Sequence, residues 1–484
     1  MEAEFIVHAG QYLGAGLSIG FGAIGAALGE GYTGGYANVS IARRPAMASS
    51  YTRTMLVAQA VAETSAIFAL MVSVLLLFTD LSQWGICQWA AGIGAGLSMG
   101  LGAFGSGIGA GLPGGQALWG LSRQPQTSSN MTTTMLVSQA ICQTPAIFSL
   151  VVAFLLIFKN ASGFPLWPYS ASFLAAGLAM GLGAIGSGWG GGMTGAACCA
   201  GYARQPRLRS PLMTMNLVGQ AVAQTPAIFA LLIAIMLVVT GKTEGTIITT
   251  ATTLGAGLAI GFGAIGSGLG NGANAQGACE AITMNSETSK DMMAFMLVGQ
   301  AIGQTPVIFA LVVSLMLIFL PFGGMPVNLV GFSALVGAGL SVGIAGIGSG
   351  YGNGATGASA CRGIAISPEA RGPMLTLMLV GQAVAQTPAI FGLLVAFILM
   401  FKVQAGPATL AAAMALLSAG LCMGLGGIGP GIGNGWTAAA ACEAMGNRPE
   451  HRGLIMRTML VAQAVAQSTA IYALVIAFVL IFVV

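Results

Sequence analysis

The chain has 484 residues, of which 56% are apolar and only 6% are charged, and its formal net charge is +4. Soluble domains carry about 25% charged residues, so this composition excludes a water-exposed globular protein and indicates an integral membrane protein. The small net charge gives no sign of a nucleic-acid-binding surface. The first four residues are acidic, whereas a cleavable secretory signal begins with a basic segment, so no such signal is expected.

The sequence consists of six copies of one repeat. Each copy has a glycine-rich apolar segment and then a second apolar segment that contains a shared block, which first appears at residues 55–68. Counted from Glu63, the blocks recur at spacings of 80, 81, 80, 82 and 81 residues. The segments are long enough for membrane helices of about 20 residues, and they lack the alternation of about ten residues that marks a membrane β-barrel.

We therefore expect an all-α membrane protein with twelve transmembrane helices, arranged as six tandem helical hairpins. Glycines allow close helix packing in lipid, so the first helices are expected to form an inner layer and the bulkier second helices an outer layer that faces lipid. The expected units are hairpin 1 (residues 1–82), hairpin 2 (83–163), hairpin 3 (164–243), hairpin 4 (244–325), hairpin 5 (326–405) and hairpin 6 (406–484).

Basic residues are concentrated in the loops inside the hairpins. Thirteen of the 16 Lys and Arg residues lie there, and only Lys159, Lys242 and Lys402 lie between hairpins. Because short cytoplasmic loops carry an excess of Lys and Arg, the intra-hairpin loops are predicted to be cytoplasmic. Both termini are then expected on the opposite side.

Two acidic residues fall at membrane depth, Glu30 on the first helix and Glu63 on the second helix of hairpin 1. An ionisable group at the centre of a membrane helix costs roughly 2.5–3.5 kcal/mol and is functional by default. Both residues are about equally far from the turn, so they are predicted to lie at similar depth. Two neighbouring carboxylates there would share a proton or bind a cation.

The equivalent positions of the other hairpins carry amides or small residues. For these amides interhelical hydrogen bonding, worth about 0.6–2 kcal/mol each, is favoured over a functional role. The degenerate carboxylate positions are Gln143, Gln224, Gln304, Gln386 and Gln467; the glutamines one turn earlier are Gln59, Gln139, Gln220, Gln300, Gln382 and Gln463; the first helices have Ala110, Gly191, Asn271, Asn353 and Asn434.

No catalytic chemistry is indicated. The eight cysteines form no Cys-x-x-Cys or Cys/His cluster, so neither a metal site nor a disulfide is expected. The two histidines, His8 and His451, have no plausible partner at membrane depth for nucleophilic catalysis. We expect a non-catalytic protein that needs no cofactor.

Residues 59–68, preceded by a loop with Arg43-Arg44-Pro45, resemble the c subunit (proteolipid) of rotary ATPases, and most of all its sodium-binding bacterial type. The resemblance recurs six times and covers nearly the whole chain. It implies a fused six-hairpin subunit that forms part or all of a membrane rotor ring, the c-ring. The loop motif of the family is intact in Arg123-Gln124-Pro125 and Arg204-Gln205-Pro206 and partly kept in Asn447-Arg448-Pro449.

The resemblance also implies roles for individual residues. Glu63 matches the ion-carrying carboxylate, and Phe68 departs from the Tyr of sodium-binding relatives, which hairpin 6 retains as Tyr472 beside Ser468. If hairpin 6 closes against hairpin 1, Tyr472 and Ser468 are expected to complete the site around Glu63. The implied ion-binding residues are Glu63, Glu30, Thr64, Ser65, Gln59, Tyr472 and Ser468.

Several partners are implied in the same way. They are other c-ring chains (further copies or single-hairpin c subunits), a stator a-type subunit whose arginine meets the unloaded carboxylate, central-stalk subunits, and lipid. The loop residues expected to face the stalk are Arg43, Arg44, Arg123, Gln124, Arg204, Gln205 and Arg448.

Five of the six repeats lack the carboxylate, so hairpins 2–6 are predicted to be spacers and hairpin 1 alone to carry the ion. Thr64 and Ser65 favour Na⁺, whereas Phe68 and the second carboxylate leave H⁺ open. Each charge moved is worth about 2.3 kcal/mol per 100 mV, so few carriers per turn favour an ATP-driven pump over a synthase.

Two alternatives belong to other classes of protein. One is a non-translocating structural ring or pore derived from this family, which would use the same hairpins without ion-driven rotation. The other is a secondary transporter. The transporter is disfavoured because all repeats share one orientation and no broken helix is expected.

Overall fold

A computed structural model describes residues 2–240, 246–322, 325, 327–402 and 409–483. Lys242, expected between hairpins 3 and 4, lies outside these residues. Within the described ranges the regular structure is entirely helical, and twelve helices are long and apolar enough to cross a membrane. The predicted fold class is therefore confirmed.

Each hairpin consists of a long first helix, a single 3-10 turn and a second helix. The first helices are α1 (Glu2–Arg43), α3 (Gln88–Arg123), α6 (Leu166–Arg204), α8 (Ile247–Met284), α11 (Leu329–Ile366) and α13 (Leu410–Asn447). The second helices are α2 (Ala48–Phe78), α4 (Ser128–Cys142) with α5 (Thr144–Phe158), α7 (Arg209–Val239), α9 (Ser289–Gly303) with α10 (Thr305–Phe319), α12 (Arg371–Phe401) and α14 (Arg452–Phe482).

Proline ends most of the first helices. Five of the six intra-hairpin 3-10 turns begin with Pro, as in Pro45–Met47, and proline disfavours helical geometry in the residue before it. Arg44 accordingly has φ −141° and ψ 78°. In hairpin 4 the turn is Ser286–Thr288, and the Asn285 side chain accepts a hydrogen bond from the Glu287 N–H at 3.2 Å.

Two second helices are interrupted for one residue, which the sequence did not lead us to expect. α4 gives way to α5 at Gln143, and α9 gives way to α10 at Gln304. A proline two residues later, Pro145 or Pro306, cannot donate its backbone N–H to the helical ladder. Gln143 keeps φ −81° and ψ −13°, so the chain continues across the membrane and the interruption does not make an unwound transporter site.

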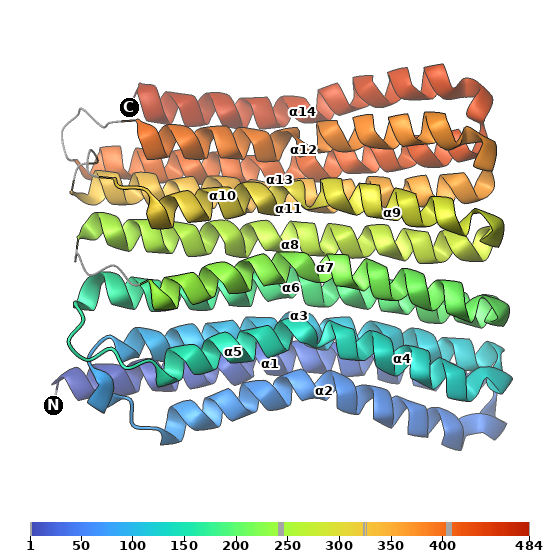
Figure 1. The fold of residues 1–484 in the computed structure, drawn as a ribbon, viewed down its shortest axis with the longest axis horizontal. Helices are drawn as coiled ribbons and strands as arrows, with labels where there is room; N and C mark the ends of the chain where they lie inside the picture. Colours follow the sequence, from blue (N-terminus) through green and yellow to red (C-terminus); the bar gives the residue numbers. More distant parts are fainter. Residues whose placement is uncertain (1, 241–245, 323–324, 326, 403–408, 484) are drawn as a thin grey trace.

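The hairpins lie side by side in chain order, with α1 and α2 at one edge of the array and α13 and α14 at the other (Figure 1). Consecutive first helices contact one another along their length, whereas consecutive second helices touch over a much smaller part of theirs. Both layers have one helix per hairpin. The first helices are therefore packed against one another more extensively than the second helices.

Glycine permits this close spacing. Gly192 of α6 lies against the backbone of Gly109 in α3, and Gly272 of α8 lies against Gly190 in α6. A methyl group at either glycine would collide with the preceding first helix. Small residues at such positions let helix backbones touch in lipid, and here they form the predicted inner layer.

Candidate functional site

The two glutamates of hairpin 1 lie at the same level of the hairpin. Gln59, one turn before Glu63 on α2, donates from Nε2 to the backbone carbonyl of Glu30 on α1 at 3.0 Å. The Glu63 side chain is exposed and Glu30 is half-buried, and the two carboxylates are within electrostatic reach of each other. The structure thus brings together Glu63, Glu30 and Gln59 from the predicted set.

The hydroxyl residues after Glu63 bond within their own helix. Thr64 Oγ1 donates to the Ala60 carbonyl at 3.1 Å, and the buried Ser65 Oγ donates to the Ala62 carbonyl at 3.1 Å. A hydroxyl that donates its proton in this way keeps its oxygen lone pairs as acceptors. The hydrogen bonds of Thr64 and Ser65 thus lie within α2.

The glutamines at the Glu63 position reach across the joints, a joint being the contact between two consecutive hairpins. Gln143 Nε2 donates to the Val61 carbonyl at 2.9 Å, and Val61 lies two residues before the carboxylate position of the preceding hairpin. The acceptor holds the same relative place in the next three joints. These bonds run from Gln224 to Ile141 (3.4 Å), from Gln304 to Val222 (3.4 Å) and from Gln386 to Ile302 (2.7 Å).

Hairpin 6 departs from this pattern. Gln467 Oε1 accepts a hydrogen bond from Asn434 Nδ2 at 2.7 Å, within the same hairpin. Its Nε2 has no partner among the residues that the structure describes. The amide in hairpin 6 is therefore not committed to the preceding hairpin.

The glutamines one turn before the Glu63 position make hydrogen bonds within and between hairpins. Gln139 Nε2 lies 2.8 Å from the Ala110 carbonyl of its own hairpin and 3.0 Å from the Ala58 carbonyl of the preceding one. Gln220 instead donates to Asn216, whose Nδ2 donates to Ser138 Oγ of hairpin 2 at 3.0 Å. Such bonds are the expected use of amides between membrane helices. Three other glutamines make the same pair of hydrogen bonds to backbone carbonyls. They are Gln300 to Asn271 and Gly219, Gln382 to Asn353 and Gly299, and Gln463 to Asn434 and Gly381.

A single chain does not bring Tyr472 and Ser468 to Glu63. Both lie on α14, at the edge of the array opposite to α2 (Figure 1). Tyr472 is 65% exposed, whereas its counterparts, such as Phe148 and Phe229, are partly buried against the apolar core. Four hairpins separate hairpin 6 from hairpin 1 in the array, so the completion of the site by Tyr472 and Ser468 stays a prediction.

The predicted stalk-contact residues lie at the loop end of the array. The guanidinium carbons of Arg43 and Arg123 lie 3.6 and 4.8 Å from the centroid of the Trp119 ring, an aromatic residue that sequence reasoning did not single out. Arg44 and Arg204 are exposed. The remaining contacts are Gln124 O with Thr127 N (3.1 Å), Gln205 Nε2 with Thr283 O (2.7 Å) and Arg448 with Glu450 (3.6 Å).

An ion-pair cluster joins three first helices near the same end. Arg362 of α11 pairs with Glu280 of α8 at 3.0 Å and with Glu443 of α13 at 3.1 Å. These three residues were not singled out by the sequence analysis. The signal was present, because the three residues follow one another at 82 and 81 residues, which is the repeat spacing.

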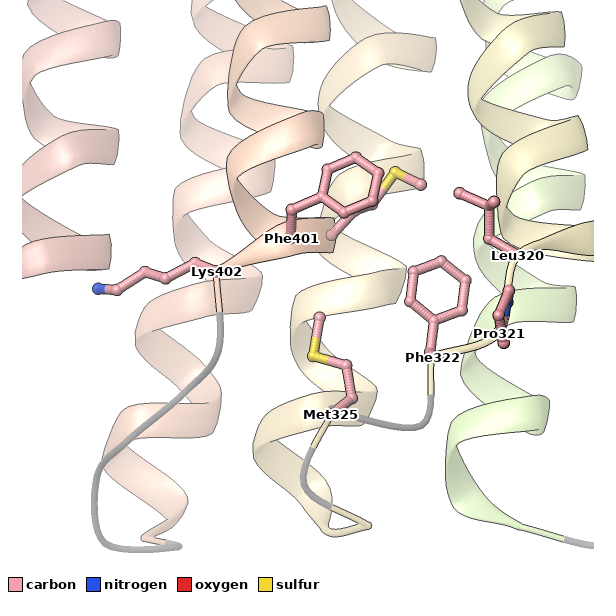
Figure 2. A pocket seen from close by; sticks show the side chains of 7 residues that line it. Leu320, Pro321, Phe322, Met325, Phe401 and Lys402 are labelled. Carbon is pink, nitrogen blue, oxygen red and sulfur yellow. The ribbon is translucent and has the colours of Figure 1, made fainter.

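A cavity of about 330 Å³ lies at the end of the array away from the intra-hairpin turns (Figure 2). Phe401, on its wall, is 15 residues beyond Gln386, or about 22 Å along a helix. Lys402 donates to the Ile481 carbonyl. The cavity has no acidic lining and offers no second cation site. It is lined by Leu320, Pro321, Phe322, Met325, Met400, Phe401 and Lys402.

Comparison with known proteins gives a consistent result over the whole chain. Six segments match the family of the ATP synthase C subunit: residues 13–76, 93–156, 174–237, 254–317, 336–399 and 417–480. The chain is 35% identical over 238 residues to the K subunit of the A-type ATP synthase of Methanocaldococcus jannaschii, which covers 49% of this chain and 99% of that protein. It is 56% identical over 68 residues (14% of this chain) to the ATP synthase c subunits of Thermotoga petrophila and of Dehalococcoides mccartyi, covering 80% and 90% of those proteins.

Proposed function

Because the chain belongs to the family of ATP synthase C subunits, we propose that it is a rotor-ring component that carries Na⁺ or H⁺ across the membrane on Glu63. As a member of the c/K type it is a non-catalytic, multi-pass membrane component of a rotary ATPase ring. One observation supports the role of Glu63 above the others. It is the only ionisable side chain among the six equivalent positions, and it is exposed on the outer helix.

The hydrogen bonds of the glutamines support a spacer role for hairpins 2–5. An ionised carboxylate has only hydrogen-bond acceptors, and so has a carbonyl. The two groups therefore attract each other only when a proton or a cation lies between them. The Gln143 amide already supplies a donor to the Val61 carbonyl at 2.9 Å. The amide thus holds the position that a loaded carboxyl would take, and it cannot release a charge. In hairpin 6, Gln467 likewise cannot ionise.

The oxygen atoms near Glu63 are compatible with either ion. Thr64, Ser65 and the backbone can supply neutral oxygens to Na⁺, a hard cation that prefers oxygen ligands. Glu30 adds a second carboxylate at the same level, and two close carboxylates also retain a proton readily. Competition by sodium for carbodiimide labelling of Glu63 separates the two ions.

A ring that carries few ions per rotation is better suited to an ATP-driven pump than to an ATP synthase. Each ion moved against the membrane potential costs about 2.3 kcal/mol per 100 mV, and a ring with one carboxylate per six hairpins moves few ions per rotation. ATP hydrolysis can then drive each ion against a steep gradient. In the opposite direction, the same ring collects little energy per turn for ATP synthesis.

We also propose an orientation and partners. The excess of arginine in the intra-hairpin loops supports a cytoplasmic location of these loops, with both termini on the opposite side. The loop arginines would contact a central stalk, and an arginine of a stator a-type subunit would meet the unloaded Glu63. Further chains, as copies or as single-hairpin c subunits, and lipid would complete the ring.

The experiment is ATP-driven ion uptake into vesicles that contain the assembled ATPase. Glu63→Gln should abolish uptake of both Na⁺ and H⁺ while the ring remains assembled, because Gln occupies this position in five other repeats. Glu280→Gln removes a carboxylate that lies outside the site and should leave uptake intact. Uptake that persists in Glu63→Gln would favour the alternative, a structural ring or pore.

A further inference from the structure

We infer that hairpins 4, 5 and 6 each bind one water molecule in the membrane interior, at the level of Glu63. In each hairpin the water accepts a hydrogen bond from one buried amide nitrogen. The three nitrogens are Asn271 Nδ2, Asn353 Nδ2 and Gln467 Nε2. The inference goes beyond the proposed function and does not depend on whether Glu63 carries an ion.

These three nitrogens are exceptional within the part of the chain that the structure describes. They are its only buried side-chain amide nitrogens without a hydrogen-bond partner, and each belongs to a different hairpin. Asn271 and Asn353 are fully buried, and Gln467 is 9% exposed. A buried N–H without a partner is rare in native proteins, and hydrocarbon supplies no solvent to satisfy it. The three sites therefore call for a ligand that accepts a hydrogen bond.

In hairpins 4 and 5 the asparagine is left without a partner because the glutamine bonds elsewhere. Gln304 Nε2 donates to the Val222 carbonyl of hairpin 3 at 3.4 Å, and neither side-chain atom of Asn271 has a partner among the described residues. Hairpin 5 repeats this arrangement with Gln386 and Asn353. Each of the two hairpins thus has one amide more than its hydrogen bonds can serve.

In hairpin 6 the same shortage falls on the glutamine. Asn434 Nδ2 donates to Gln467 Oε1 at 2.7 Å, and Gln467 Nε2 is left over. By the repeat, the acceptor for Gln467 in hairpin 5 would be the Val384 carbonyl, two residues before Gln386. Val384 also lies four residues before Pro388, which has no N–H to give to the helical ladder. A water between Gln467 Nε2 and this carbonyl would serve both groups.

The shortage is the same for either orientation of the amides. Both side-chain atoms of Asn271 and of Asn353 lack partners, so exchanging oxygen and nitrogen still leaves an N–H without an acceptor. In hairpin 6, exchanging both amides only moves the unpaired N–H from Gln467 to Asn434. One donor per hairpin remains in every case.

Water fits these sites because it accepts and donates hydrogen bonds at once. Buried waters make about three hydrogen bonds to polar groups that are otherwise unsatisfied. Gln300 and Gln382 each donate from Nε2 to the backbone carbonyl of the asparagine, at 3.0 and 2.9 Å. Unpartnered acceptors at the same level are the Oε1 atoms of Gln300, Gln382 and Gln463. They can receive the protons of the water.

The surroundings favour a neutral ligand over an ion. No charged residue lies within two helical turns of Asn271, Asn353 or Gln467 along the sequence, and an uncompensated charge in the membrane interior is costly. Asn271 and Asn353 occupy the position that Glu30 has in hairpin 1. Hairpins 4 and 5 would thus hold a hydrated amide where hairpin 1 holds a carboxylate.

Electron cryo-microscopy of the full chain in lipid nanodiscs, at a resolution that shows bound water, tests the inference. Density for one molecule is expected about 3 Å from each of Asn271 Nδ2, Asn353 Nδ2 and Gln467 Nε2. None is expected at Ala110 and Gly191, the equivalents of Asn271 in hairpins 2 and 3. The density should be the same in sodium-free buffer.

A variant separates the amide from its surroundings. Asn271→Ala gives hairpin 4 the residue that hairpin 2 has at Ala110, so the fold has a precedent for it. The density in hairpin 4 should be lost, while the density at Asn353 should remain as the control within the same molecule.

Three results would overturn the inference. Well-defined side chains without density beside any of the three nitrogens would mean that the amides are dry. Density that disappears without sodium would mean that a cation is bound. Density in hairpin 4 that survives Asn271→Ala would mean that the amide does not hold the water. Each result can be read whether or not Glu63 is labelled by carbodiimide, so it is separate from the test of the proposed function.

Discussion

Glutamate and glutamine have nearly the same shape and differ in the group that meets the neighbouring hairpin. Gln143 presents an N–H donor to the Val61 carbonyl at 2.9 Å, whereas an ionised Glu63 presents only acceptors. The carboxylate needs a proton or cation at this place and the amide does not. Under the proposed function, a carrier and a spacer hairpin of this chain would differ in this single polar group.

Gln143→Glu should convert hairpin 2 into a second carrier. The new carboxylate would face the Val61 carbonyl, so it needs a proton or cation there, as Glu63 does. Carbodiimide labelling followed by mass spectrometry should find two modified carboxylates per chain instead of one. Gln143→Leu, which breaks the same hydrogen bond without adding a charge, should leave one. A Gln143→Glu chain with Glu63 alone modified would show that the spacer role does not depend on the amide.

Only part of the candidate site could be predicted from the sequence. Glu63 was singled out because it is ionisable where five repeats have glutamine, and the repeat spacing that Arg362 shares with Glu280 and Glu443 could have pointed to their cluster. The sequence did not predict to which neighbouring hairpin the glutamine side chains donate their hydrogen bonds. Helical periodicity gives the face of α2 on which a side chain lies, but it does not say which neighbouring hairpin covers that face.

At the scale of the helices, the repeat predicted the six hairpins and the glycines of the first helices predicted the two layers. The sequence did not predict the interruptions of two second helices. Pro145 and Pro306 lie two residues after the breaks at Gln143 and Gln304, yet Pro226 and Pro388 occupy the same positions in α7 and α12 without a break. Proline at this position is therefore not sufficient to interrupt a helix. The sequence pattern at this position therefore does not distinguish the interrupted from the continuous helices.

The cluster around Arg362 should stabilise the packing of α8, α11 and α13. Arg362→Ala removes the shared cation and leaves Glu280 and Glu443, on the helices either side of α11, without this ion-pair partner. Because these side chains are partly exposed, we expect a loss of about 1 kcal/mol in unfolding free energy, which shrinks at high salt. Denaturant unfolding of the purified chain measures it. Arg371→Ala, which breaks the single pair with Asp291, should cost less. An equal or larger cost for Arg371→Ala would contradict the bridging role.

In the whole molecule, the same kind of surface is covered in the internal joints and uncovered at the two ends. Gly192→Ala forces a methyl group into the backbone of Gly109 and should destabilise every chain by about 1–3 kcal/mol. Gly31→Ala, the equivalent change at the free edge, has room in the single chain. It should leave the unfolding free energy of the chain unchanged, as measured by denaturant unfolding. An equal loss in Gly31→Ala and Gly192→Ala would contradict the close packing of Gly192 on Gly109 as the cause.

The central claim is that Glu63 is a working ion carrier in the assembled ring. It is tested most directly by carbodiimide labelling of the membrane-embedded protein across pH, with and without sodium, and identification of the modified residue by mass spectrometry. Such reagents attack a protonated, lipid-accessible carboxyl. We predict that Glu63 is modified, that sodium suppresses the reaction if Na⁺ is the ion, and that sodium has no effect if H⁺ is carried. A Glu63 that stays unreactive at every pH would contradict the account and favour a structural ring.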